Sequence, residues 1–419
     1  MPEMNDHFQR AKTIIDRVNE LAGISEDKQC LTRTFGSEAF IESQIKIISW
    51  MNEAGLETRI DNIGNVRGKL RVPGSHRKTL VIGSHFDTVV NAGKFDGPLG
   101  IVIGLDIIQH LIKLKESIPF NVELIAFCDE EGVRFHTTYL GSKVVAGSFD
   151  KNLLFEKDSA AISLEEVIHL IGGDCNKLLE DSFAGTELIG YFEIHIEQGP
   201  VLYEKHIPIG VVSGIAGQKR IEITFNGIAG HAGTVPMEMR SDALCAASEF
   251  ILAVENFAIG TKGQVVATIG KLEISNAASN VIPGRVVCWL DLRSQWESSL
   301  SSTYDTMCKY CKEICKKRGL LFEWKLVQES NPVSCDEQMT LLLKSAIRDS
   351  GYEIVQLVSG AGHDAVPLSE ISPVAMLFVR CFQGISHNPL ENVELKDIAA
   401  AIHVSDNFFK NLIDKFKHQ

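Results

Sequence analysis

Basic residues are fewer than acidic residues in this chain. It contains 41 Lys and Arg but 54 Asp and Glu, which gives a formal net charge of −13. No run of Lys or Arg rises above the scattered single residues. A nucleic acid is therefore not expected as a partner, because its phosphate backbone binds to a cationic surface.

Long apolar stretches are missing as well. Residues 1–19 carry charges throughout, so we expect no secretion signal. We also expect no window to approach the ~18 apolar residues that a membrane span requires. These absences predict a cytoplasmic protein without a membrane partner.

Paired cysteine motifs are also lacking, and ten cysteines without paired spacing are typical of reduced thiols in a reducing compartment. Cys308, Cys311 and Cys315 lie close together, but they fall on one face of a helix predicted over 301–317. No second cluster completes a tetrahedral set of ligands, so we expect these thiols to pack in a core.

The chain has 419 residues, more than one hydrophobic core usually holds, which predicts two domains with one inserted into the other. Apolar residues at helical spacing predict helices over 5–55, and 56–72 has the pattern of strands around a turn at Gly64-Asn65. This opening indicates an α/β catalytic domain.

The segment LVIGSHFDTVVNAGKFDG, which begins at Leu80, joins a predicted buried strand to a loop with ligand-type side chains. His85 follows the strand, at the end where α/β sheets bind ligands. Asp87 is placed to accept the second imidazole N–H of His85 and to fix its tautomer. Asp96 precedes Gly97, which permits a tight turn that points this carboxylate back toward a metal.

Three further segments end in similar side chains. The strand NVELIAF leads into Asp129, Glu130 and Glu131, the alternating strand YFEIHIE carries His195, and His387 follows the apolar strand 374–379. Each segment alone fits a hydrogen-bonded loop or a solvated acidic turn. Together they supply three imidazoles and two carboxylates, enough for two metal ions if Asp96 bridges them about 3.5–4 Å apart.

Glu130 would lie beside the metals without binding them. A carboxylate there can take a proton from water and pass it to a leaving nitrogen. The donor set suits zinc and manganese alike, so the sequence leaves the metal open.

The order of predicted elements changes after Val212. Strands are expected over 220–225, 264–274, 285–292 and 321–328, with helices over 242–257 and 301–317. This βαββαβ order is typical of a ferredoxin-like unit. We therefore predict an inserted domain at 213–329, within a catalytic domain made of 1–212 and 330–419.

Seven motifs in order, GSHFDTV, KFDG, DEEG, HIEQGP, GHAGTVPM, NVIPG and GISH, carry a resemblance to a known family. The chain resembles the dinuclear-metal amidohydrolases related to aminoacylases, and among them the allantoate amidohydrolase and N-carbamoyl-L-amino acid hydrolase group. HIEQGP separates this group from its peptidase relatives, which have an acidic residue where His195 stands. The resemblance implies a metallopeptidase-like fold, with a mixed sheet flanked by helices.

The resemblance also implies roles for individual residues. One metal would bind His85, Asp96 and His195, and the other Asp96, Glu131 and His387, with Glu130 as the general base. The inserted domain would form a homodimer and act as a lid. His231 would polarise the scissile carbonyl, reaching into the partner's site, while Asn280 and Arg293 would hold the substrate carboxylate.

The substrate is expected to be a small ureido carboxylate. Gln218 offers an amide that can pair with a ureido group, and SGAGHDA at 359–365 is more similar to the allantoate enzymes. We therefore favour allantoate amidohydrolase over N-carbamoyl-L-amino acid hydrolase or an enzyme for ureidoglycolate or β-ureidopropionate. A dipeptidase or aminoacylase and a non-catalytic binding protein are more distant alternatives.

Overall fold

The computed structural model describes residues 2–73, 78–114, 118–183 and 185–417. The chain divides into two compact units. The first consists of residues 1–213 and 335–419, and the second is Gly214–Ser334.

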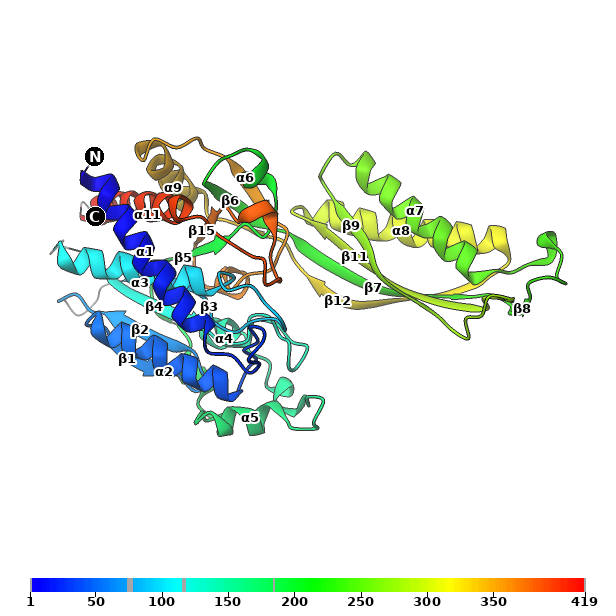
Figure 1. Ribbon diagram of the computed structural model, residues 1–419, viewed down its shortest axis with the longest axis horizontal. Coiled ribbons are helices and arrows are strands. Elements are labelled where there is room, and N and C mark those ends of the chain that lie inside the picture. The colour runs from blue at the N-terminus through cyan, green and yellow to red at the C-terminus, as the bar shows by residue number, and fades with distance from the viewer. Residues whose placement is uncertain (1, 74–77, 115–117, 184, 418–419) are drawn as a thin grey trace. The chain divides into compact units, whose positions relative to one another are not determined.

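The first unit is built on a mixed sheet in the order β1-β2-β4-β3-β5-β15-β6, with β14 paired to β6 (Figure 1). The strands are β1 (Glu57–Ile60), β2 (Val66–Leu70), β3 (Thr79–His85), β4 (Asn121–Phe127), β5 (Leu188–Ile196), β6 (Ile209–Ile215), β14 (Gln356–Ser359) and β15 (Val374–Val379). The central strands β4, β3, β5 and β15 are mutually parallel, whereas β2 and β6 run antiparallel to them. The predicted α/β class with a mixed sheet is confirmed.

Every residue of β3 is buried, as expected for a central strand that is covered on both faces. The long helices of this unit are α1 (Pro2–Ala22), α2 (Glu38–Glu53), α3 (Pro98–Lys113), α9 (Glu337–Asp349) and α11 (Leu395–Lys417). Shorter helices lie in the loops: α4 (Leu140–Ala146), α5 (Leu164–Leu170), α6 (Val201–Glu204) and α10 (Ala365–Leu368). Because the four parallel strands point the same way, their carboxyl ends bring four separate loops to one edge of the sheet.

The second unit has a four-stranded antiparallel sheet in the order β12-β7-β11-β9. Its main elements are β7 (Gly217–Asn226), α7 (Ala243–Gly260), β9 (Val266–Ile274), β11 (Arg285–Ser294), α8 (Glu297–Arg318) and β12 (Leu321–Ser330). The two helices pack on the sheet through a core that includes Phe225, Phe250 and Met307. Cys311 and Cys315 lie buried in this core, as predicted, whereas Cys308 is only partly buried and does not belong to it.

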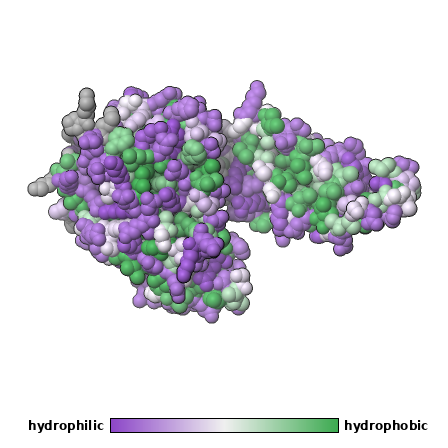
Figure 2. Space-filling view, viewed as in Figure 1, coloured by the Kyte–Doolittle hydropathy of each residue, from purple (hydrophilic) through white to green (hydrophobic). Residues whose placement is uncertain are grey.

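Helix α7 corrects the expectation that no segment is apolar enough to cross a membrane. Its 18 residues reach that length and hydropathy, although only 28% of the window is buried. The core helix of a soluble protein meets the same test, and residues such as Phe250 and Val254 do pack on the sheet. Leu252 and Ile259 are instead 58% and 71% exposed, and Figure 2 shows hydrophobic atoms on the visible face of this unit.

Candidate metal centre

His85 and His195 are held with their Nε2 atoms facing one another. His85 ends β3, and its Nδ1 lies 3.1 Å from the main-chain oxygen of Asp87. On β5, Nδ1 of His195 lies 2.9 Å from the main-chain oxygen of Ile196. A carbonyl oxygen only accepts, so both Nδ1 atoms carry the hydrogen, and each neutral ring presents a bare lone pair at Nε2.

The two Nε2 atoms are 3.4 Å apart, and both residues are 2% exposed. Two lone pairs at this distance repel one another unless a proton or a cation lies between them. Burial opposes charge on the His85 ring, yet Asp96, Glu130 and Asp87 together raise its pKa well above the usual value. The surroundings therefore favour positive charge at this point.

Asp96 connects this pair of histidines to a second group of donors. Its Oδ1 lies 3.1 Å from Nε2 of His195 and 3.7 Å from Nε2 of His85. Its Oδ2 lies 3.0 Å from Nε2 of His387, whose ring is also 3.3 Å from Oε1 of Glu131. One carboxylate thus presents one oxygen to each of two groups.

The ligand atoms of His85, Asp96 and His195 all lie within 4.8 Å of one another, as do those of Asp96, Glu131 and His387. Among the described residues, none donates a hydrogen bond to the buried Oδ1 of Asp96, which costs free energy unless a cation is present. Imidazole and carboxylate donors suit zinc and manganese. The predicted ligands therefore meet, and their chemistry fits a pair of divalent cations.

Glu130 is buried beside these donors, within 4.8 Å of ligand atoms of His85 and Glu131. It could therefore also act as a ligand, which the sequence had not indicated. Burial raises the pKa of Glu130 well above its usual value, against the opposing influence of His85. The acidic segment that follows β4 is thus an interior cluster and not a solvated turn.

Asp87 differs from its expected role. Its carboxylate lies 3.8 Å from Nδ1 of His85, and the hydrogen of that nitrogen goes to the main-chain oxygen of Asp87 instead. The carboxylate accepts the main-chain N–H groups of Glu130 and Glu131 at 3.1 and 3.2 Å. Asp87 therefore fixes the acidic segment, and only its main chain orients the histidine.

Other polar groups support Asp96, and sequence analysis missed them. Gln198 Nε2 and Ser386 Oγ donate to its Oδ2 at 2.9 and 3.0 Å. Glu391 Oε1 accepts the main-chain N–H groups of Phe95 and Asp96 at 2.7 and 3.1 Å. Gln198 and Ser386 stand inside the motifs HIEQGP and GISH, whereas no pattern in the sequence marks Glu391.

The predicted substrate residues lie in the second unit, in two separate places. Asp291 accepts hydrogen bonds from Gln218 Nε2 at 2.8 Å and from Arg293 Nε and Nη2 at 2.9 and 3.1 Å. His231 lies on β8 (Gly230–His231) and pairs with Val281 of β10 (Val281–Ile282). Asn280 is the residue just before Val281, so it lies near His231. Gln218 stands near the start of β7, and Asn226 is the last residue of that strand. At about 3.4 Å per residue, the main chains of these two residues are about 27 Å apart.

Chain order places His231 beyond Asn226, and Figure 1 shows β8 past that end of β7. Arg293 stands near the end of β11, whereas Asn280 precedes the start of that strand, so the two residues expected to hold one carboxylate together lie apart. A single small ligand cannot contact both residues of one chain.

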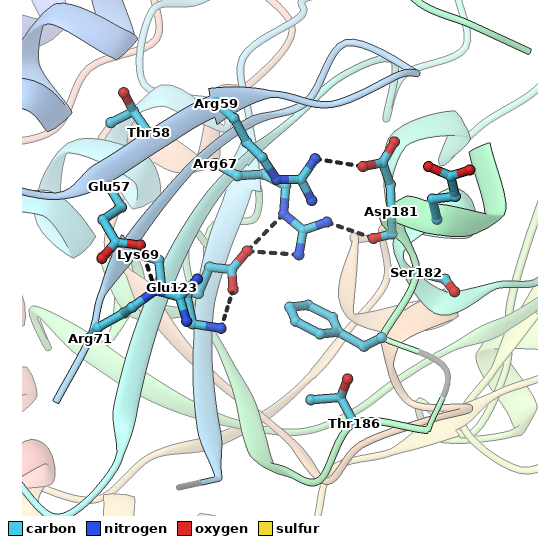
Figure 3. A pocket seen from close by; sticks show the side chains of 12 residues that line it. Glu57, Thr58, Arg59, Arg67, Lys69, Arg71, Glu123, Asp181, Ser182 and Thr186 are labelled. Carbon is cyan, nitrogen blue, oxygen red and sulfur yellow. Dashed lines mark hydrogen bonds and ion pairs between the residues drawn. The ribbon is translucent and has the colours of Figure 1, made fainter. Parts of the chain in front are cut away.

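The first unit also contains a polar pocket of about 370 Å³ (Figure 3). Its cations already have carboxylate partners: Arg59 pairs with Asp181, Arg67 and Lys69 with Glu123, and Arg71 with Glu57. Glu123 lies near the start of β4, at the opposite end of that strand from Glu130. This pocket is a compensated ion-pair network and not part of the metal centre.

Residues 81–411 match the model of peptidase family M20/M25/M40. A probable allantoate deiminase from Oryza sativa subsp. japonica is 38% identical over 97% of this chain and 89% of its own length. An N-carbamoyl-L-amino acid amidohydrolase from Geobacillus stearothermophilus is 36% identical over 85% of this chain and 87% of its own. A crystal structure of a hydantoinase/carbamoylase family amidase from Burkholderia multivorans superposes with a TM-score of 0.89, at 31% identity, over 95% of this chain and 97% of that one.

Gly97→Ala should weaken metal binding at this centre. Gly97 has φ +83°, and an added Cβ would lie 2.4 Å from the main-chain oxygen of His85 and 2.6 Å from its ring. We expect a loss of metal affinity of about 10- to 100-fold, measured by elemental analysis after dialysis against graded metal concentrations.

Gly55→Ala is the matched control, because Gly55 has φ +81° but no atom within 4 Å of the added Cβ. It should carry the same backbone strain and keep its metal. Equal metal content in both variants would contradict a role for Gly97 in shaping the site.

Proposed function

We propose that this chain, which belongs to peptidase family M20/M25/M40, is an allantoate amidohydrolase. It would hydrolyse a ureido C–N bond of allantoate to give ureidoglycine, ammonia and carbon dioxide. The observation that carries the proposal is the pair of donor groups that share Asp96, with buried Glu130 beside them. We also infer a cytoplasmic location, which the ten free cysteines support.

The proposed cofactors are two divalent ions, zinc or manganese. His85, Asp96 and His195 would hold one ion, and Asp96, Glu131 and His387 the other. Such ions supply Lewis-acid polarisation of a carbonyl group and lower the pKa of water.

Glu130 is the proposed general base. Burial raises the pKa of its carboxyl group, which brings its proton affinity closer to that needed for transfer near neutral pH. It would take the proton from the attacking water and deliver it to the leaving nitrogen. Asp87 would act as a positioning residue, since it holds the main chain of Glu130 and Glu131.

The proposed substrate contacts come from both ends of the second unit. Arg293 would bind the carboxylate, a task suited to its planar guanidinium group. Gln218 would pair with the ureido group, and Asp291 holds the two side chains together. Such a polar pair favours a ureido carboxylate over the apolar side chain of a peptide or an N-acyl amino acid.

We further propose that Gly214–Ser334 is a ferredoxin-like lid and dimerisation domain. Because His231 and Asn280 stand at the opposite end of β7 from Gln218 and Arg293, we propose that both act in the partner's site. Edge strand β9 and the exposed apolar side chains of α7, Leu252 and Ile259, offer a surface for the second copy.

A substrate panel tests the proposed function. We expect purified protein loaded with manganese or zinc to turn over allantoate faster than N-carbamoyl-L-amino acids, and dipeptides least, as measured by ammonia release and chromatography. Preference for N-carbamoyl-L-amino acids would replace allantoate with the second candidate, which the Geobacillus relative supports.

Glu130→Gln should keep the bound metal and lose turnover by about 10²- to 10⁴-fold, because proton transfer at this position is removed. Steady-state rates and elemental analysis on the same preparation measure both quantities. Glu180→Gln, at an exposed carboxylate in the pocket of Figure 3, is the control and should be fully active. Wild-type rates for Glu130→Gln would remove this residue from the base role.

Mixing two inactive variants tests the dimer. A His231→Ala subunit keeps its own Glu130, and a Glu130→Gln subunit supplies the intact histidine. After unfolding and refolding of an equal mixture, we expect about a quarter of wild-type activity, because half of the dimers are mixed and each restores one site. An inactive mixture would place His231 in its own subunit's site, and an active His231→Ala variant on its own would place it outside catalysis.

A further inference from the structure

A second group of metal-binding side chains lies at the end of α5, apart from the catalytic donors. Glu165 and His169 stand one helical turn apart on this helix, and Cys175 follows in the next loop. One ligand atom from each residue lies within 4.8 Å of the other two. Figure 1 shows α5 at the lower margin of the first unit, away from the strand ends that carry the catalytic donors.

A turn at Gly172 and Gly173 reverses the chain after α5 and brings Cys175 back beside this helix. Gly172 has φ +86°, and the N–H of Gly173 donates to the oxygen of Ile168 at 2.8 Å. Gly173 also packs closely on the main-chain oxygen of Asn62, where an added Cβ would lie 2.0 Å away. Asp174 Oδ1 then accepts the N–H of Asn176 at 3.0 Å, so the loop around Cys175 is fixed on both sides.

His169 is oriented as metal-binding histidines usually are. Its Nδ1 lies 3.2 Å from the main-chain oxygen of Gly173, which can only accept. The hydrogen is therefore on Nδ1, and Nε2 keeps a lone pair. A carbonyl partner of this kind fixes the tautomer of a zinc-binding imidazole.

The structure assigns a zinc site to Glu165, His169 and Cys175, and we propose that it fastens the loop 172–177 to α5. Thiolate, imidazole and carboxylate are the donors that zinc prefers, and three protein ligands leave the fourth position of a tetrahedron to water. Binding forms a bond from zinc to the sulfur and releases the thiol proton to solvent.

Burial and nearby carboxylates both affect the thiol of Cys175. Cys175 is 5% exposed, whereas Glu165 and His169 face solvent, so an ion can enter from that side. Burial, with Glu165 and Asp174 nearby, raises the pKa of Cys175 to about 11. Without a cation the thiol thus stays protonated near neutral pH. A bound ion would offset the negative charge of Glu165 and Asp174, which opposes ionisation of the thiol.

Cobalt substitution separates this site from the catalytic centre. The catalytic donors are nitrogen and oxygen only, so a near-ultraviolet thiolate-to-cobalt absorption band in the full chain reports a cysteine ligand. We expect this band when Co²⁺ is added to metal-free protein, and one more zinc per chain in wild type than in C175S by elemental analysis.

C175S and H169Q should lose the band, whereas C245S should keep it, because Cys245 is exposed and belongs to none of the donor groups found in the described part of the chain. His169 is exposed, so H169Q decides the matter if C175S does not fold. A wild-type protein without the band, or a band that persists in C175S or H169Q, would overturn the assignment.

Discussion

The structure depends on one shared carboxylate. Asp96 stands between the two donor groups, and neither group has three members without it. Burial opposes its ionisation, but His195, His387 and His85 lower its pKa well below the usual value. The negative charge is thus fixed where two cations would need it, and Gly97 and Glu391 hold the main chain that carries it.

Main-chain groups set the geometry of the histidines around that carboxylate. The carbonyl oxygens of Asp87 and Ile196 determine which ring nitrogen of His85 and His195 is free. His387 has φ +53°, a conformation that L residues rarely adopt, and such strain is common at functional sites. Main-chain contacts thus fix which nitrogen of His85 and His195 can face a cation.

The second unit follows a different constraint. An antiparallel sheet of this length keeps its two ends apart, so Gln218 and Arg293 cannot share one small ligand with His231 and Asn280 of the same chain. Either one of these pairs has no part in binding, or the two pairs that contact one ligand come from different copies of the chain. This geometric reason, together with the apolar surface of α7, makes dimerisation part of the proposed function.

The sequence by itself determined the α/β class, most helices and strands, and the five donors, because buried strands and ligand-type side chains leave regular local patterns. His85, Glu131, His195 and His387 each follow or stand on a recognisable apolar strand, so their convergence could be predicted. Only the tertiary structure decided that Asp87 holds the acidic segment, that Glu391 supports Asp96, and that Asn280 and Arg293 lie apart. Those relations join residues distant in the chain, through hydrogen bonds and strand register that no local pattern encodes.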